Sequence, residues 1–424
     1  MLSPRNERSP ERATLEVSHD ECRNLGTGKN MVEYSPFSEE IIHGDPHPIY
    51  KGLRDEAPLY FIEEYDAWAL SRFQDVWDAS ADLNFSSVRG STTSHILTKK
   101  LPLLRMMNIM EPPDHTTIRS TLRPHFSRGR MRKLLPEFRQ YIEDALDALQ
   151  DRDEIDVVTD FAQGLATFVA STVAGFPKED GEMLRDLVAA FFKRADGVPG
   201  FTEEGVQAQA QMIEYFVRLS EERRRKPSSE NDVLSALHGV EVGGALIDDF
   251  EVATNLTLLL TGGTDTLPKV FANTVYRLYQ NPGDRNKVVA DPARALDAFH
   301  EALRLDMPTQ NMCRSLNEDT EMYGTKMKAG QPVLLLYAAA NRDEREFPEP
   351  DTFIMDRKPP RHLGFGHGTH ACLGLHAARA EATIGLQEML KRFPDYEVRE
   401  EGLVKLQTEF VQGYSKMPIR LNAR

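Results

Sequence analysis

One glycine-rich loop constrains this chain more than any other feature. The segment 365–374 reads F-G-H-G-T-H-A-C-L-G and leads straight into an amphipathic helix. First-turn N–H groups and the positive end of the helix dipole favour a thiolate at Cys372. Gly366, Gly368 and Gly374 remove side chains where the backbone has to wrap closely around a ligand. Such a thiolate is suited to be the axial ligand of a haem iron.

Two other interpretations of this loop compete. Gly366, Gly368 and Ala371 also satisfy the dinucleotide-binding pattern G-x-G-x-x-A before a helix. That pattern requires a buried strand just upstream, whereas the residues there read D-R-K-P-P-R-H-L, with two prolines and several ionisable side chains. The other alternative is that Cys372 is an ordinary buried thiol in a turn. The sequence favours the haem ligand over both.

The composition describes a globular protein that works in a reducing compartment. The chain has 424 residues, of which 40% are hydrophobic and 28% charged, and its net charge of −15 argues against nucleic acid as a partner. The three cysteines, Cys22, Cys313 and Cys372, are widely spaced and odd in number, which argues against a disulfide framework. No apolar run of about 18 residues and no signal peptide is visible. We expect a cytoplasmic protein without a membrane anchor, with a disordered tail at residues 1–35.

The hydrophobic periodicity predicts the order of the secondary structure. Residues 58–72 have the pattern of a β-hairpin. From residue 73 to about residue 310 the period is helical, and strand character returns at 320–338 and near the C-terminus. We expect 223–232 to be a charged loop between two helices. The clearest helices are predicted at 139–149, 161–174, 207–222 and 248–280. The fold class is therefore mainly α (α+β), with small β-sheets.

The apolar helix around 255–269 contains three residues that disfavour a helix interior. Gly262 and Gly263 each cost about 1 kcal/mol relative to alanine, and Pro268 costs about 3 kcal/mol. Thr266 can bond back to the carbonyl of Gly262, while Pro268 leaves a carbonyl one turn earlier without its normal donor. We expect this helix to be locally opened for function.

These segments together resemble the cytochrome P-450 superfamily, in its motif order and over nearly the whole chain. The loop around Cys372 matches the haem-binding loop of that family. H-E-A-L-R at 300–304 matches its E-x-x-R motif, Arg357 matches the third member of the same buried structural triad, and 340–353 matches the meander before the loop. The resemblance implies the cytochrome P-450 fold, a single haem-thiolate monooxygenase domain at 36–424 around a buried haem b.

The resemblance also implies roles for individual residues. Asp265 and Thr266 match the acid–alcohol pair that delivers protons to bound dioxygen, so they are the expected catalytic residues. Gly262 and Gly263 match the groove that makes room for dioxygen, and Cys372 matches the iron ligand. Charge-assisted hydrogen bonds suit a dianion such as the two haem propionates. The positions that match the propionate contacts are His115, Arg119, Arg314 and His370, and the loop adds Phe365 and Gly374.

The implied reaction is monooxygenation, with O2 as co-substrate. No flavin or iron–sulfur module fits in this length, so the resemblance implies an external ferredoxin and an NAD(P)H-dependent ferredoxin reductase. A locally basic stretch follows the expected propionate contact Arg119, and we expect it to form part of the ferredoxin-docking face of a monomer. A merely solvated surface is the alternative. The further cations of this stretch are Arg123, Arg128, Arg130, Arg132 and Lys133.

The substrate is expected to be lipophilic. By position, the pocket walls come from segments that are apolar and rich in methionine, which suits a terpenoid, a steroid or a macrocycle. A peroxide-driven peroxygenase and a non-catalytic haem sensor or carrier are the alternatives, and the intact Asp265–Thr266 pair argues against both. The expected wall segments are 85–109, 184–201, 259–263, 307–312 and 410–414.

Overall fold

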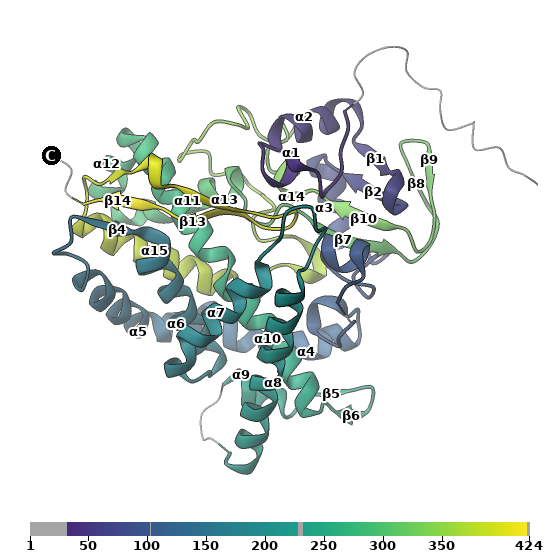
Figure 1. The fold of residues 1–424 in the computed structure, drawn as a ribbon, viewed down its shortest axis with the longest axis horizontal. Helices are drawn as coiled ribbons and strands as arrows, with labels where there is room; N and C mark the ends of the chain where they lie inside the picture. The colour runs from purple at the N-terminus through teal and green to yellow at the C-terminus, as the bar shows by residue number, and fades with distance from the viewer. Residues whose placement is uncertain (1–31, 102, 228–231, 422–424) are drawn as a thin grey trace, which may run out of the picture.

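Helices dominate the computed structural model, which describes residues 32–101, 103–227 and 232–421. The longer helices are α2 (His47–Glu56), α3 (Phe73–Ala81), α4 (Asp114–Leu122), α5 (Arg128–Asp147), α6 (Gln163–Ala174), α7 (Gly181–Phe192), α8 (Glu203–Arg225), α10 (Asp249–Thr264), α11 (Thr266–Gln280), α12 (Pro282–Ala290), α13 (Ala295–Leu305) and α15 (Leu375–Arg392). The short helices are α1 (Glu39–Ile42), α9 (Val233–Leu237) and α14 (Tyr337–Ala340). Most of the long helices fill the left and lower parts of Figure 1.

The strands form small sheets, as predicted. The largest has the order β1-β2-β10-β7-β3 and lies at the right of Figure 1. Its strands are β1 (Leu59–Ile62), β2 (Ala67–Leu70), β10 (Pro332–Leu335), β7 (Met312–Leu316) and β3 (Phe85–Ser86). A second sheet joins β11 (Glu397–Val398), β14 (Pro418–Arg420) and β4 (Glu154–Asp156). The two-stranded ribbons pair β12 (Val404–Gln407) with β13 (Gln412–Lys416), β5 (Glu241–Val242) with β6 (Ala245–Leu246), and β8 (Thr320–Met322) with β9 (Thr325–Met327).

The predicted hairpin at 58–72 is confirmed as β1 and β2, which pair antiparallel. Parallel pairing of β2 with β10 ties this hairpin to the strands that the sequence predicted at 320–338. The charged loop predicted at 223–232 begins later than expected, because α8 continues to Arg225. Three arginines in the last turn of α8 complement the negative end of its dipole, which explains the extension.

The N-terminal boundary also differs from the prediction. Residues 1–31 of the predicted tail, including Cys22, lie outside the described residues. Tyr34, the first aromatic residue that the structure describes, has only 4% of its surface exposed. Its ring lies 6.4 Å from that of Tyr50 and 6.1 Å from that of Tyr60, and its N–H donates to the Tyr60 hydroxyl. Aromatic packing therefore includes Tyr34 in the folded part, before the predicted boundary at residue 36.

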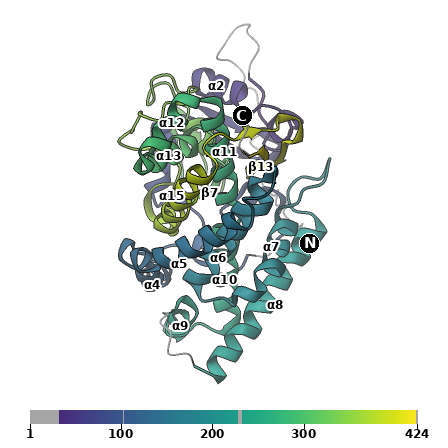
Figure 2. The ribbon, with the colours of Figure 1, turned by 90° about the vertical axis from the view of Figure 1, so that its left-hand side faces the viewer.

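The central helix is α10, which packs against α6, α7 and α8. In Figure 2 it lies behind α6 and beside α8. Its threonines bury their hydroxyls by bonding back to carbonyls one turn earlier, as Thr257 does to Ala253 at 2.9 Å and Thr264 does to Leu260 at 2.8 Å. The helix can therefore be buried on almost every side without orphaned hydroxyl groups.

The single helix predicted at 248–280 is two helices. α10 ends at Thr264 and α11 starts at Thr266, with Asp265 between them. Pro268 consequently lies in the first turn of α11, where its missing N–H would have no intrahelical partner in any case. The expected local opening is confirmed, and the proline explains where it occurs.

One helical stretch, Val157–Ala174, is long and apolar enough to cross a membrane by length and composition alone. No continuous apolar run was visible in the sequence because polar residues such as Asp160 and Gln163 interrupt it. In the fold, 61% of the stretch is buried inside the protein. A core helix passes the same test, so this stretch is weak evidence for a membrane span.

The E-x-x-R motif forms the buried triad expected from the sequence. The Arg304 guanidinium donates to both carboxylate oxygens of Glu301, at 3.0 and 2.8 Å, and Arg357 donates to Glu301 Oε1 at 3.0 Å. Arg304 also donates to the carbonyls of Asn341 and Pro350, both at 2.8 Å. The side chains of Arg304 and Glu301 are 0% and 2% exposed. The triad thus ties α13 to the segment that precedes the Cys372 loop.

We predict that Glu301→Gln destabilises the fold by about 3–5 kcal/mol, because it leaves two buried guanidiniums without their carboxylate. Urea unfolding of the purified protein measures the change. The matched control is Glu214→Gln, which removes an exposed pair with Arg218 and is expected to cost less than about 1 kcal/mol. Equal losses in the two variants would contradict a stabilising role for the triad.

Candidate active site

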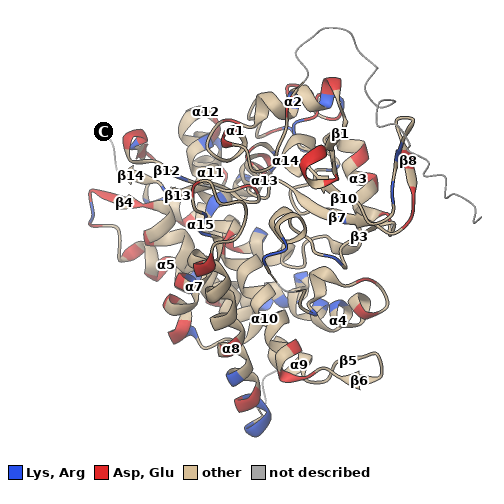
Figure 3. Ribbon diagram, turned by 45° about the vertical axis from the view of Figure 1, so that its right-hand side comes forward, with Lys and Arg blue, Asp and Glu red and all other residues tan. Residues whose placement is uncertain are grey.

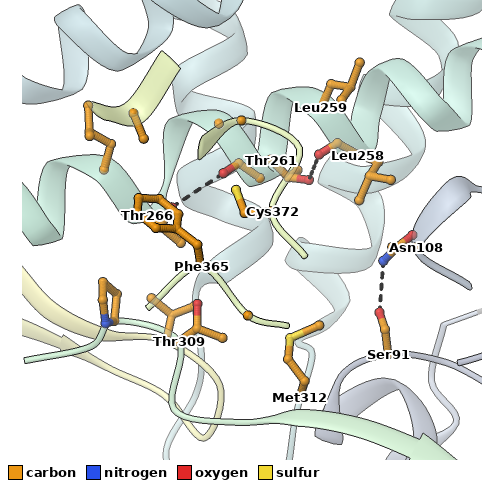
Figure 4. A pocket seen from close by; sticks show the side chains of 18 of the residues that line it. Ser91, Asn108, Leu258, Leu259, Thr261, Thr266, Thr309, Met312, Phe365 and Cys372 are labelled. Carbon is orange, nitrogen blue, oxygen red and sulfur yellow. Dashed lines mark hydrogen bonds between the residues drawn. The ribbon is translucent and has the colours of Figure 1, made fainter. Parts of the chain in front are cut away.

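A cavity of about 430 Å³ lies between the α10–α11 break and the glycine-rich loop. Figure 4 shows Phe365 and Cys372 on that loop, beside the helices that carry Thr261 and Thr266. Three predicted site residues, Asp265, His115 and Arg119, are not among the lining residues. Those that line the cavity are Gly262, Gly263, Thr266, Arg314, Phe365, His370, Cys372 and Gly374.

Cys372 lies at the point where the loop becomes a helix. Its N–H donates to the carbonyl of Phe365 at 2.8 Å, which closes the loop, and the residue is exposed toward the internal cavity that it lines, where the protein shields the thiol from bulk water. Burial raises the pKa of the Cys372 thiol, whereas the N–H groups of Gly374 and Leu375 and the Arg119 guanidinium lower it. The thiol therefore becomes a thiolate most readily when a cation such as iron replaces its proton.

Two of the loop glycines are required by packing and by backbone conformation. Gly368, at φ +70°, packs against α3, where an added Cβ would lie 2.3 Å from the carbonyl oxygen of Ser80. Gly366 has a φ of +67°, which strains any other residue. Gly374 has an ordinary φ of −79°, and a Cβ there would make only van der Waals contact with the Cys372 sulfur. Packing and backbone conformation thus explain the first two. Gly366 and Gly374 also line the cavity, so the close wrapping of a ligand stays a prediction.

The α10–α11 break presents a hydroxyl and open space to the cavity. The Thr266 hydroxyl faces the carbonyl of Gly262 at 3.5 Å, in agreement with the bond predicted from the sequence. A Cβ added to Gly262 would meet nothing within 4 Å, and one on Gly263 would only touch Ala170. The two glycines therefore leave room for a small molecule next to Thr266.

Asp265 does not line the cavity and forms a buried ion pair that the sequence analysis missed. Lys269 donates to Asp265 Oδ1 at 2.5 Å and to the Asp265 carbonyl at 2.9 Å. The side chains of Lys269 and Asp265 are 7% and 8% exposed, and Asp265 Oδ2 has no hydrogen-bond partner among the described residues. Lysine one turn after an acid looks like an ordinary surface pair in a sequence, so nothing there distinguished it.

The four expected propionate contacts come together near the loop. The Arg314 guanidinium lines the cavity, and the rings of His115 and His370 lie 4.5 Å apart. Arg119 donates to the carbonyl of Ala371, next to Cys372. Both ring nitrogens of the buried His115 lack partners in the described part of the chain, so this side chain is available to bind a ligand.

The two histidines of this cluster are uncharged at pH 7, unlike the two arginines. Burial, with smaller contributions from His370 and Arg119, lowers the pKa of His115 to about 4. Burial also lowers the pKa of His370, although Glu111 opposes the shift. The cluster therefore offers two guanidiniums and two neutral imidazoles at pH 7. Neutral imidazoles still donate an N–H, so they fit a carboxylate acceptor.

Glu111 is a further member of this cluster that the sequence analysis did not assign. Its Oε1 accepts from the Ser87 N–H at 2.8 Å and lies 3.7 Å from His370 Nε2. Burial raises the pKa of Glu111, but hydrogen bonds from His370 and Ser87 lower it by more, and the resulting pKa is about 2. Glu111 is thus an anion that orients His370. It stands four residues before His115, and that proximity was the only signal in the sequence.

All five expected wall segments reach the cavity, although not every side chain expected there does. Three phenylalanine rings, Phe191, Phe192 and Phe201, pack together on one wall, with neighbouring centroids 5.0 and 5.1 Å apart. Of the residues expected at the wall, Leu103 is 60% exposed and Met107 is buried in the adjacent core instead. The expected side chains that do line the cavity are Leu101, Met106, Phe191, Phe192, Leu259, Met307 and Phe410.

Comparisons with known proteins agree with this geometry. The sequence model of the family described as Cytochrome P450 matches residues 83–414. The chain is 33% identical to cytochrome P450 130 of Mycobacterium tuberculosis, with 89% of this chain and 96% of that protein covered. It is similar in structure, with a TM-score of 0.80 and 26% identity, to CYP109E1 from Bacillus megaterium in complex with testosterone, covering 89% of this chain and 98% of that one.

A mutant of P450 EryK in complex with erythromycin B matches with a TM-score of 0.79 and 26% identity, covering 88% of this chain and 95% of that one. The relatives therefore extend over nearly the same length as the described fold. The match includes the α10–α11 break, the buried triad and the Cys372 loop, and with these features this chain belongs to the cytochrome P450 family.

Proposed function

We propose that this monooxygenase hydroxylates a bulky lipophilic molecule, with electrons from an external ferredoxin and its reductase. Its family uses haem b and O2, with electrons derived from NAD(P)H through redox partners. The observation that carries the proposal is the cavity itself, which has Cys372 on one side and Thr266 with Gly262 on the other. A single domain is proposed that comprises the predicted range 36–424 together with Tyr34, and cytoplasmic location and the monomeric state stay predictions.

The residues around the cavity fit a haem. Cys372 would hold the iron, and Arg314, His370, Arg119 and His115 would hold the propionates through N–H donors. When bound, haem b supplies an iron that activates dioxygen, and its thiolate ligand donates electron density that favours cleavage of the O–O bond. The unpartnered nitrogens of His115 support this assignment, because a buried polar group otherwise costs free energy.

Asp265 and Thr266 are proposed to manage protons on the opposite side of the cavity. The Thr266 hydroxyl is the polar group of this pair that lines the cavity, so it would donate a hydrogen bond to the reacting oxygen. Asp265 precedes it in the chain and would exchange protons through Oδ2, which has no hydrogen-bond partner in the part of the chain that the structure describes. Gly262 and Gly263 leave the space that this small reactant needs.

The walls support an uncharged, lipophilic substrate. Aromatic and aliphatic side chains dominate the lining, and Met106, Met307 and Met312 add adaptable surface. The similar proteins named above were solved with testosterone and with erythromycin B, a steroid and a macrocycle. We therefore propose a steroid-, terpenoid- or macrocycle-like substrate. A peroxygenase or a haem sensor is not favoured, since neither requires a hydroxyl and an acid at the helix break.

The proposed docking face for ferredoxin is the start of α5 together with the end of α4. α5 packs along α15, the helix that follows Cys372, so this face lies close to the loop. Burial lowers the pKa values of His376 and Arg379 on α15, and nearby Arg128 lowers both further. Blue segments lie in and beside α4 in Figure 3.

A run of cations without any acidic residue distinguishes this segment, since residues 115–136 contain neither Asp nor Glu. Within the described ranges, the cations at this face have no acidic side chain within ion-pair distance, although the protein as a whole is acidic. Unpaired exposed cations are suited to bind an acidic partner, because no intramolecular pair has to be broken first. The cations are Arg123, Arg128, Arg130, Arg132 and Lys133, whereas the half-buried Arg119 and Arg379 already donate to the Ala371 carbonyl and to His300.

The first experiment is a carbon monoxide difference spectrum of the reduced, purified protein. We expect the red-shifted Soret band after which the family is named, because Cys372 is positioned as a thiolate ligand. The Cys372→His variant is expected to keep haem but to lose that band. A band at the ordinary position in the unaltered protein would mean that the thiolate is not the ligand, and the proposed reaction would lose its basis.

We predict that Thr266→Ala lowers product formed per NAD(P)H by about tenfold or more when dioxygen is the oxidant, because proton delivery is worth about 10²–10⁴-fold. Activity with hydrogen peroxide is expected to survive. The substrate is first chosen by its spin-state shift of the haem band. Thr261→Ala is the matched control, since Thr261 also lines the cavity but bonds to the Thr257 carbonyl at 2.9 Å. Equal losses in both variants would contradict a special role for Thr266.

Charge reversal at the docking face is predicted to weaken turnover supported by ferredoxin. Arg128→Glu with Arg130→Glu should raise the KM for ferredoxin and reduce its dependence on salt, because two cations of the face are lost. Steady-state kinetics at several ionic strengths measure both. Arg218→Glu with Arg225→Glu on α8 changes the net charge equally, and the proposal fails if both pairs behave alike.

A further inference from the structure

Three segments that wall the cavity meet at one buried carboxylate, Glu409. This residue lies in the turn between β12 and β13 and is 0% exposed. The next two residues, Phe410 and Val411, line the cavity. The Glu409 carbonyl accepts from the Asn311 side chain at 2.8 Å, which fixes the turn against the strand β7. A fully buried charge at such a junction requires partners, and it has two.

The first partner is Arg194, which follows α7. Its Nε donates to Glu409 Oε2 at 3.0 Å and its Nη2 to Oε1 at 2.9 Å, which makes a bidentate pair. The second partner is the Ser94 hydroxyl, which donates to the same Oε1. Ser94 belongs to the segment whose neighbours Ser91 and Thr92 line the cavity. One carboxylate thus joins three walls that are far apart in sequence.

Arg194 also contacts other residues at the end of α7 and on the cavity wall. Its Nη1 lies 3.2 Å from each of the carbonyls of Phe192 and Lys193 at the end of α7. Its guanidinium carbon lies 4.7 Å from the centre of the Phe201 ring, within the range of a cation–π contact. Phe192 and Phe201 both line the cavity. Movement of Arg194 would therefore move two aromatic side chains of the wall.

The ion pair, which does not itself line the inner cavity, lines a second hollow. This outer hollow measures about 300 Å³, and Arg194 and Glu409 are among its lining residues. Its other walls include Phe37, Ile42 and Leu406, so part of it is apolar. Phe410 directly follows Glu409, and Phe192 lies two residues before Arg194. Both phenylalanines line the inner cavity. The Arg194–Glu409 pair consequently lies between the outer hollow and the inner cavity.

We propose that the substrate enters through the outer hollow. The Arg194–Glu409 ion pair is the gate of this entrance, and its opening limits the size of the molecule that can reach the inner cavity. If the two side chains separate toward the hollow, both charges become hydrated. The free energy of this hydration offsets the loss of the ion pair. Gly197 and Gly200, at φ +69° and +73°, lie in the segment that follows Arg194 and line the hollow. Such residues can absorb the backbone change of a moving segment. The inference rests on the proposed function, because it concerns access to that same cavity.

The test is the association rate of 4-phenylimidazole with the haem-loaded ferric protein, followed by stopped-flow absorbance. Glu409→Gln removes the charge but keeps the shape, and we expect it to raise this rate about fivefold or more. Carbon monoxide, which is much smaller, should bind the reduced protein at an unchanged rate. Glu204→Gln is the matched control, because it removes an exposed pair of Glu204 with Lys193, the residue next to Arg194, at 2.8 Å.

Equal association rates for Glu409→Gln, Glu204→Gln and the unaltered protein would overturn the proposal. Should Glu409→Gln fail to fold, Ser94→Ala loosens the same carboxylate by one hydroxyl and is expected to raise the rate less, in the same direction. Hydrogen exchange of 193–201 provides a readout without haem chemistry, and it should accelerate in both variants. These measurements require only bound haem. A normal carbon monoxide spectrum together with unchanged association rates of 4-phenylimidazole would therefore disprove the gate and leave the proposed function intact.

Discussion

The interruption of the hydrogen-bond ladder between α10 and α11 is the constraint on which the rest of this structure depends. A buried helix normally satisfies every carbonyl with an N–H one turn later. Pro268 removes one such donor, and Lys269 provides another nearby by donating to the carbonyl and carboxylate of Asp265. The break can therefore exist in the core, and it turns the Thr266 hydroxyl toward the cavity.

The opposite side of the cavity depends on a rigid support for Cys372. The loop approaches α3 at Gly368 more closely than any side chain would allow, and the Cys372 N–H closes it on Phe365. Behind it, the Glu301 triad holds the preceding segment through side-chain bonds to backbone carbonyls. The two sides of the site are thus built in opposite ways. One side is a helix that lacks a backbone hydrogen bond, and the other is a loop that additional hydrogen bonds hold in place.

How much could be predicted from the sequence varied with the range of the interaction. The helices, the first hairpin and the order of the motifs follow local periodicity, and the Cys372 loop is a contiguous pattern. A local opening of the helix around 255–269 was also foreseen, because proline and two glycines act on their own helix, but its division into two helices at Asp265 was not. The ion pair of Arg194 with Glu409 joins residues 215 positions apart, and no local pattern indicates such a contact. Glu111 was missed for a related reason, since its role depends on Ser87 and His370.

Charge serves two distinct purposes in this acidic protein, and burial separates them. Inside, each of the carboxylates Glu301, Glu409 and Asp265 is paired with a cation, as the cost of a buried charge requires. At the start of α5 the cations are exposed and have no acidic neighbour within the described residues. A buried pair resists separation and so fixes geometry, whereas an exposed unpaired cation costs little and attracts a partner of opposite charge. Positive charge near the Cys372 loop is therefore better explained by a partner than by the stability of the fold, because the fold gains nothing from leaving it unpaired.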